Sequence, residues 1–506
     1  MLLAVIAVSP ASISAEENPV PNEIKWIVKP VMNYDGLREF HDGLARVSKL
    51  VNGKSKFGYI DKNGREVVPV VYDGASDFSE GLAAVGKNNK WGFIDKDGKI
   101  VIPLMYNKVD SFSHGLAWVN KNGKWGFIDK NGKTVLPFEY TLGPSSDATL
   151  QHISDNLVRV VKSSDGSEGL FDLSKRKLLF TADRIMNLSD NLIMVQKNDK
   201  FGFIDPTGKI VLPIQYAYVE DFHEGLAAVG KKDPKSRAIK YGYMNKSGKI
   251  VIPYQYQSAG IFSDGVAVVR VRFDSSTYKA TLRIIDKNGK NILGKDISDY
   301  FNIGPFVNGT AVVDKFAHDQ HKLGLIDKSG KLVLPVEYDS ILDYKSFING
   351  KPVPYPHGIK FIVKDEMTGL TDPKGKIVLQ PSYLSISVIT DKVLDVTDGQ
   401  GISRLADIET GAYLGDTAFH GDRYTPVIVS EFAEGPLISV ETIEGQRIAL
   451  NEAGQQMLPL ADDEMNAFEP FYASEGVIAV LQNGKWGIIA NPFVQTDRPS
   501  APQRSQ

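Results

Sequence analysis

The chain has 506 residues, no cysteine and a formal net charge of −3 at pH 7. Without cysteine it can form neither disulfides nor thiolate metal sites, and its nearly balanced charge provides no basic face for nucleic acid. Its 46 glycines and 26 prolines are well spread, which indicates many turns rather than a disordered polypeptide.

Residues 1–15, MLLAVIAVSPASISA, resemble a secretory signal peptide, because an apolar run from Leu2 to Val8 is followed by small residues up to Ala15. No basic region precedes the apolar run, so the segment would be a truncated signal peptide. The alternative is that these residues are simply an apolar, frayed N-terminus without a role in export. We therefore expect an exported protein that is periplasmic, on the cell surface or secreted. No stretch approaches the roughly 20 apolar residues of a transmembrane helix, so no transmembrane segment is expected.

The segment Trp91–Pro103, WGFIDKDGKIVIP, predicts a β-hairpin. Its two halves are rich in aromatic and β-branched residues, and the Asp-Gly pair that ends in Gly98 supplies the positive φ of a tight turn. Pro103 has no N–H to donate, so we expect it at the end of the second strand or at a sheet edge. Gly92 leaves a gap that we expect an aromatic ring from an adjacent strand or repeat to fill.

This hairpin recurs along the chain, and Gly58, Gly92 and Gly126 follow one another at intervals of 34 residues. We count about twelve units. Clear copies begin at Phe57, Trp91, Trp125, Phe201, Tyr241 and Leu323, and worn copies begin at Gly169, Leu282, Thr368, Ser403 and Gln446. The structural markers of the repeat are Gly58, Trp91, Gly92, Trp125, Gly126, Gly202, Gly242, Gly324, Trp486 and Gly487.

A second motif lies between successive hairpins. A tyrosine follows the proline by three residues, as Tyr106 follows Pro103, and a Phe-x-x-Gly segment comes next, as in FSEGLAAV from Phe78. The LAAV piece predicts a further strand. Each unit is therefore expected to be a three-stranded meander plus a connector from the tyrosine to the phenylalanine, with no helix.

The two ends of the array complement each other. KWIVKP, residues 25–30, reads as the last strand of a unit, and KWGIIANP, residues 485–492, stops one strand short of one. Together they would complete a unit, which fits a closed ring of blades, although an open array with half-units as caps is also possible. We expect well-formed repeats over 25–339, degenerate repeats over 340–492 and a disordered tail over 493–506.

The elements KWGFID, DKNGK and VIP-x-x-Y resemble the bacterial WG-repeat family over roughly residues 25–492. The resemblance implies an all-β tandem array of β-meanders, propeller-like or openly superhelical, that is often exported and has a role in binding. It implies no catalytic residue, because the shared positions are structural. Arg283, Arg404 and Arg447 replace the marker glycine in three units, which puts their packing in doubt.

Catalytic, cofactor-binding and metal-binding residues are not expected. The Asp-x-Asp-Gly turn at Asp95 resembles the start of a calcium loop, but an apolar strand follows where a further carboxylate ligand is required. His318 and His321 are close in sequence, yet their spacing suits a shared metal poorly. Neither a Gly-x-Ser-x-Gly elbow nor a phosphate-binding loop is present.

Two features remain as a candidate ligand surface. One is the set of acidic turn residues Glu80, Glu224 and Asp264, and the other is the ring of Trp118. An acid recurs in the Phe-x-x-Gly turns (Asp42, Glu80, Glu224, Asp264, Glu434 and Glu475) and could form a row that binds cations or a basic partner, although a solvated turn position is favoured. His114 replaces the acid in one unit. Trp118 occupies a position that is alanine in other units and could stack on a sugar, although core packing is favoured.

We therefore predict a non-enzymatic, exported binding scaffold whose ligand, an unidentified protein or polysaccharide, lies across several units. One alternative is a carbohydrate-binding envelope protein that uses exposed aromatic rings such as Trp118. A second alternative is an enzyme whose site is built from the insertions at residues 231–240 and 347–358, because function in repeat folds often resides on loops.

Overall fold

The computed structural model describes residues 25–141, 151–233, 238–275, 279–317, 320–343, 345–348, 351–354, 358–420, 427–430, 437–443, 447–456, 469–482 and 484–490. The expected signal peptide and the expected tail lie outside these residues. The chain divides into two compact units, residues 1–135 with 383–506, and residues 136–382. Within the described part no helix is long and apolar enough to cross a membrane.

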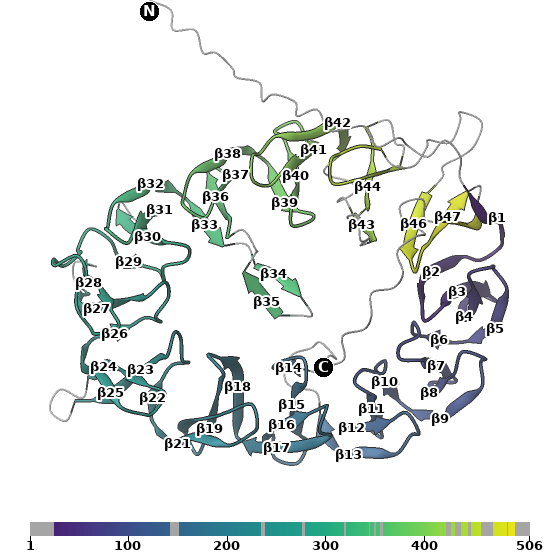
Figure 1. The fold of residues 1–506 in the computed structure, drawn as a ribbon, viewed down its shortest axis with the longest axis horizontal. Helices are drawn as coiled ribbons and strands as arrows, with labels where there is room; N and C mark the ends of the chain where they lie inside the picture. Colours follow the sequence, from purple (N-terminus) through teal and green to yellow (C-terminus); the bar gives the residue numbers. More distant parts are fainter. Residues whose placement is uncertain are drawn as a thin grey trace, which may run out of the picture. The chain divides into compact units, whose positions relative to one another are not determined.

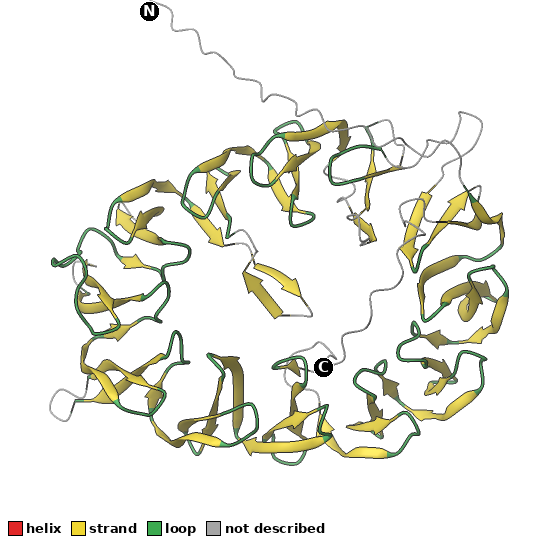
Figure 2. Cartoon of the chain, in the orientation of Figure 1, coloured by secondary structure: helices red, strands yellow, loops and turns green. Residues whose placement is uncertain are grey.

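One repeat shows the common architecture, an antiparallel sheet whose strands follow the chain order (Figures 1 and 2). It consists of β6 (Gly74–Ala75), β7 (Ala83–Lys87), β8 (Lys90–Ile94) and β9 (Ile100–Tyr106). The first strand has only two residues and lies within the predicted connector. The three-stranded prediction therefore omitted a short fourth strand, which has too few residues to leave a hydrophobic pattern in the sequence.

The other repeats of the first unit have the same design. Their strands are β1 (Trp26–Met32), β2 (Gly36–His41), β3 (Leu44–Val51), β4 (Lys54–Asp61), β5 (Glu66–Tyr72), β10 (Lys108–Val109), β11 (Leu116–Lys121), β12 (Lys124–Asp129), β39 (Ser385–Val388), β40 (Val393–Thr397), β41 (Ile402–Asp407), β42 (Tyr413–His420), β43 (Val427–Ser430), β44 (Leu437–Glu441), β45 (Arg447–Leu450), β46 (Glu469–Ser474), β47 (Val477–Gln482) and β48 (Lys485–Ala490). Strand β13 (Thr134–Thr141) contains the boundary between the two units.

The second unit repeats the design with some losses. Its strands are β14 (Gln151–His152), β15 (Leu157–Lys162), β16 (Glu168–Asp172), β17 (Lys177–Ala182), β18 (Arg184–Ser189), β19 (Leu192–Lys197), β20 (Lys200–Ile204), β21 (Ile210–Tyr216), β22 (Tyr218–Val219), β23 (Leu226–Lys232), β24 (Ile239–Asn245), β25 (Ile250–Tyr256), β26 (Ser258–Ala259), β27 (Val266–Asp274), β28 (Lys279–Asp286), β29 (Asn302–Ile303), β30 (Thr310–Ala317), β31 (Gln320–Asp327), β32 (Leu332–Tyr338), β33 (Ser340–Asp343), β34 (Lys345–Ile348), β35 (Lys351–Pro354), β36 (Lys360–Lys364), β37 (Met367–Thr371) and β38 (Ile377–Tyr383).

The predicted hairpin is confirmed, with β8 paired antiparallel to β9. The turn between them begins at Asp95, whose Oδ1 accepts the backbone N–H groups of Asp97 (3.1 Å) and Lys99 (2.9 Å). Gly98 then takes a φ of 79°. The carboxylate that looked like a calcium ligand is therefore used by its own turn.

The space at Gly92 is filled by backbone. A Cβ on Gly92 would lie 2.4 Å from the carbonyl oxygen of Ile102 and 2.7 Å from the carbonyl carbon of Pro103. The register of β8 against β9 shifts at this point, so β9 bulges across the glycine. The expectation of an aromatic ring at Gly92 is therefore wrong. A ring is found at another marker glycine, Gly487, where an added Cβ would lie 2.6 Å from the ring of Trp26. Pro103 lies within β9 rather than at its end, and β9 is the edge strand of its sheet.

The hydrophobic core lies between consecutive repeats. One cluster joins Leu44, Tyr59 and Val68 of one repeat to Phe78 and Val85 of the next. In four repeats the phenylalanine of the Phe-x-x-Gly segment packs edge-on against an aromatic ring of the preceding repeat, with ring centroids 4.7 to 4.9 Å apart: Tyr59–Phe78, Phe93–Phe112, Phe203–Phe222 and Tyr243–Phe262. This phenylalanine is therefore a contact between repeats.

The two ends of the chain complete one repeat within the first unit, which is the first of the two arrangements that the sequence left open. Strand β1 pairs antiparallel with β48, and Trp26 lies opposite Ile489. The resulting sheet has the order β1-β48-β47-β46. Counted in this way, the described residues form twelve repeats.

We predict that Gly92→Val destabilises the protein more than Lys96→Ala. The valine Cβ would meet the backbone of β9 rather than a movable side chain, so a cost of about 1–3 kcal/mol or more is expected. Lys96→Ala removes an exposed turn charge and should change stability by less than about 0.5 kcal/mol. Urea unfolding of both variants measures this, and equal shifts in midpoint would contradict the described packing of Gly92.

Candidate functional site

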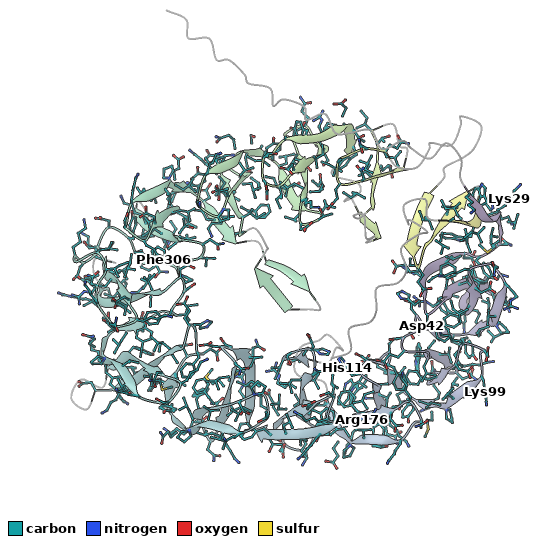
Figure 3. All side chains as sticks on the ribbon, in the orientation of Figure 1. Lys29, Asp42, Lys99, His114, Arg176 and Phe306 are labelled. Atoms are coloured by element: carbon teal, nitrogen blue, oxygen red, sulfur yellow. The ribbon has the colours of Figure 1, made fainter. Side chains whose placement is uncertain are left out.

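The acids of the candidate surface share an unusual backbone conformation. Asp42, Glu80, Glu224, Asp264 and Glu475 have φ between 49° and 55°, and the glycine after each also has a positive φ. Few residues other than glycine adopt this region. In Figure 3, Asp42 lies at the turn between β2 and β3, and Lys99 lies on the opposite, β9 side of its repeat.

Each of these carboxylates contacts the next repeat. Glu80 Oε2 accepts the backbone N–H of Gly115 (3.0 Å) and lies 3.1 Å from Nζ of Lys130, both in the following repeat. Nζ of Lys130 also donates to the backbone carbonyl of Glu80 at 2.8 Å. The acid, the glycine and the lysine thus form a joint that connects consecutive repeats.

The joint recurs in both units. The carboxylates of Asp42, Asp190, Glu224, Asp264 and Glu475 accept the N–H groups of Gly81, Gly225, Gly265, Gly309 and Gly43, respectively. Lysines complete it at Lys62 with Glu475, Lys246 with Asp190 and Lys287 with Glu224. The serine before the acid adds a bond of its own, since Ser79 Oγ donates to the carbonyl of Phe112 at 2.8 Å.

The electrostatics of the joint favour the ionised carboxylate. Burial acts to raise the pKa of Glu224, but the hydrogen bonds from Lys287 and Gly265 outweigh it and hold the pKa below its usual value. Asp190 shows the same balance, with Lys246 and Gly225 as donors. Carboxylates with these partners are already satisfied within the protein, so the acidic row reads as a structural device.

Sequence reasoning missed Asp190, because its repeat has Asn191 where the others have glycine. Asn191 adopts a φ of 61°, and asparagine is one of the few residues that tolerate this region. A search for Ser-acid followed by Gly or Asn would have found it. Glu434 lies outside the described residues, and the His114 ring has its Nδ1 2.9 Å from Oγ of Ser113.

Trp118 is buried, with 3% of its surface exposed. Its ring stacks on that of Trp125, with ring centroids 5.7 Å apart. It also packs at a tilt against the ring of Phe127, with centroids 4.6 Å apart. The hypothesis that Trp118 presents a ring to sugars is therefore wrong, and the packing interpretation is confirmed. The marker tryptophans are also packed: the ring of Trp91 lies against Gly74 and Gly86, and Trp486 is 4% exposed.

The position of Trp118 varies widely between repeats. This position pairs with the residue after the marker glycine. It is Arg46, Ala84, Trp118 or Ala228 in clear repeats, and Asp395 in a worn repeat. Arg46 donates to the carbonyl of Ala75 in the next repeat at 2.6 Å. This variable position faces the neighbouring repeat, so its variation changes packing rather than the outer surface.

Acids with raised pKa values are isolated from one another. Burial raises the pKa of Asp110 to about 6 and that of Asp395 to about 6, and the two lie in different repeats. His321 forms a 2.8 Å contact with Asp314, and His318 lies outside the described residues. Among the residues that the structure describes, no group of three His, Asp or Glu side chains could hold a metal ion.

The insertions proposed for an enzyme site are described only in part. The first, at residues 231–240, is described except for 234–237. The second, at 347–358, contributes to a hairpin in which β34 pairs with β35. The side chains of that hairpin lie outside the described residues, so its chemistry stays a prediction.

The WG containing repeat family matches this sequence in six segments: residues 57–91, 91–125, 125–142, 201–233, 241–272 and 324–350. The chain carries WG repeats. The matches cover the clear repeats, and the described sheets extend the same design to worn units such as the one that contains β40 and β41. No curated protein matches the sequence significantly.

Solved structures that resemble the WG-repeat chain have low sequence identity. A eukaryotic initiation factor is 10% identical, with a TM-score of 0.34, and the match covers 66% of this chain and 95% of that one. BamB from Moraxella catarrhalis is 12% identical (TM-score 0.22, 56% and 92% covered), and the tricorn protease is 13% identical (TM-score 0.25, 86% and 54% covered). The description as a propeller-like array of meanders rests on the sheet order given above.

We predict that the Glu224 joint makes stability depend on pH in the acidic range. Because its folded pKa lies below the ordinary 4.5, the joint's contribution is fully present above that pH and is lost as pH falls through the folded pKa. Glu224→Gln should therefore cost about 1 kcal/mol at pH 7 and progressively less below pH 4.5. Urea unfolding across this range tests it, with the exposed Glu220→Gln as control; a cost independent of pH would contradict the joint.

Proposed function

We propose that the protein is a non-enzymatic, exported scaffold that binds a partner protein across several repeats. The observation that carries the proposal is a pair of exposed aliphatic residues at the start of the fourth strand of several repeats. These outer-strand pairs are Ile100 and Val101, Ile210 and Val211, Ile250 and Val251, and Leu332 and Val333, with exposed fractions from 36% to 51%. Exposed apolar surface that recurs regularly is typical of interaction sites.

The outer-strand pairs are exposed for a structural reason. The next residue along each strand, such as Ile102 or Ile252, is buried, and the turn glycine of the following repeat packs on it. A Cβ on Gly132 would lie 3.6 Å from Ile102, and a Cβ on Gly289 would lie 3.2 Å from Ile252. The third aliphatic residue of these strands therefore serves the contact between repeats. Among the pair residues, Val333 also lies against the next repeat, because a Cβ on Gly375 would be 3.6 Å from its Cβ.

The surroundings of the pairs indicate the chemistry of the partner. Three of the four pairs lie in the second unit, and each follows a lysine, at Lys209, Lys249 and Lys331. A surface of aliphatic side chains beside ammonium groups suits a protein partner that offers apolar side chains together with carboxylates. A sugar ligand is less well supported, because Trp118 and the marker tryptophans are packed.

Export is part of the proposal and is supported by the apolar run from Leu2 to Val8 with the small residues after it. A scaffold outside the cytoplasm would meet its partner in the cell envelope. Fractionation of cells that express the full chain is therefore the first arm of the test, and it should place the protein outside the cytoplasm. Retention of the full-length chain in the cytoplasm would contradict export.

The second arm compares capture from the native envelope fraction by the wild type and by the triple variant Val211→Ser, Val251→Ser, Leu332→Ser. We expect the triple variant to capture at least tenfold less partner than the wild type, because it removes exposed apolar side chains from three repeats and leaves the core unchanged. Leu50→Ser is the control, since Leu50 is 63% exposed and lies outside the pairs. Equal capture by the wild type and the triple variant would refute the outer-strand pairs as the binding surface.

A further inference from the structure

A cavity of about 240 Å³ lies in the second unit, between the repeat that contains β26 to β28 and the repeat that contains β29 to β32. One wall comes from the first repeat, with Ser258 to Ile261, Val268, Arg270 and Leu282. The facing wall is the segment Asn302 to Pro305, which includes the short strand β29. The cavity is smaller than the pockets that hold drug-sized ligands, so it suits a small molecule.

The cavity exists because this repeat departs from the clear pattern. In the clear repeat, the indole of Trp91 lies against Gly74 and Gly86 and fills the space over them. By register, Leu282 stands where Trp91 does, and Arg270 stands where Gly86 does. Here a leucine replaces the large ring and an arginine replaces the glycine. The space that the indole occupies in the clear repeat is therefore a cavity, and a guanidinium group belongs to its wall.

The guanidinium of Arg270 has no acidic partner among the described residues. Its contact with Phe273 places the guanidinium carbon 5.3 Å from the ring centroid. Its Nε is shielded from solvent and has no hydrogen-bond partner in the described structure. Two other arginines in the array have acidic partners: Arg46 lies 3.1 Å from Asp77, and Arg283 lies 2.5 Å from Asp296.

We propose that this cavity binds a small organic carboxylate. The forked end of the guanidinium matches the two oxygens of a carboxylate, which would give Arg270 the anionic partner that it lacks. The aliphatic side chains of Val268, Leu282 and Ile303 in the same walls suit a short apolar tail. The ligand is therefore a monocarboxylate with a short aliphatic chain, and the outer-strand pairs play no part in its binding.

The test is ligand-observed NMR on the full-length protein with isovalerate, acetate and inorganic phosphate as probes. We expect isovalerate to bind most tightly, because only it supplies both the carboxylate and the apolar tail. Phosphate binding equal to or tighter than isovalerate would overturn the assignment of a carboxylate. Absence of isovalerate binding at millimolar concentration would overturn the site.

Three variants locate the binding. Arg270→Met should weaken isovalerate binding roughly tenfold or more, because it removes a charge-assisted hydrogen-bonding group. Arg272→Met removes the same charge from an exposed position of β27 and should leave binding unchanged. Val268→Phe should abolish binding while Arg270 is retained, because it fills the cavity; the equivalent position already holds Trp118 in another repeat.

Thermal unfolding of each variant checks that the fold is retained. Arg270→Lys provides a second check, since it keeps the charge but not the fork and should weaken binding less than Arg270→Met. Wild-type affinity in both Arg270→Met and Val268→Phe would show that isovalerate binds elsewhere, and the proposal would fall.

Discussion

A carboxylate held at positive φ and bonded to the glycine N–H of the next repeat is the interaction on which the array depends. Glu80 with Gly115 and Glu224 with Gly265 are two instances, one in each unit. In several repeats the phenylalanine two residues before the acid packs on an aromatic ring of the preceding repeat, as Phe78 does on Tyr59. A single Phe-x-x-Gly segment therefore contacts the repeat before it and the repeat after it, so each sheet is stabilised mainly by its neighbours.

This arrangement explains why some positions vary and others recur. The marker glycine recurs because the backbone of the fourth strand crosses over it, and at Gly92 any Cβ would meet a carbonyl group. The position of Trp118 varies because it faces a neighbouring repeat whose own residues can compensate. Where both the aromatic ring and the glycine partner are lost, as at Leu282 and Arg270, the contact between repeats opens into a cavity.

Much of the fold could be predicted from the sequence, because each hairpin has its own turn chemistry and repeats at a visible interval. The completion of one repeat by β1 and β48 followed from counting strands at the two ends. The two-residue strands, such as β6, could not be predicted, because two residues show no alternation. The bulge at Gly92 was also missed. The sequence does not distinguish a glycine that is contacted by the backbone of a neighbouring strand from one that is contacted by an aromatic ring.

The candidate site could be predicted only in part. The acidic row was visible as a recurring residue, but a solvated turn gives the same pattern. Most of its glycine partners lie 35 to 45 residues further along the chain, for example at Gly115 and Gly309. Asp190 was missed because Asn191 replaces glycine. The cavity beside Arg270 results from two substitutions in paired strands, and their proximity is set by the register rather than by the sequence spacing.

Hydrogen exchange in a Glu224→Ala variant tests the central claim most directly. If the carboxylate joins consecutive repeats, amides of the next repeat, at Gly265 and in β27, should exchange faster, while those of β24 in its own repeat change less. Faster exchange confined to β23 and β24, with Gly265 and β27 unchanged, would show that the acid serves only its own turn and would contradict the account.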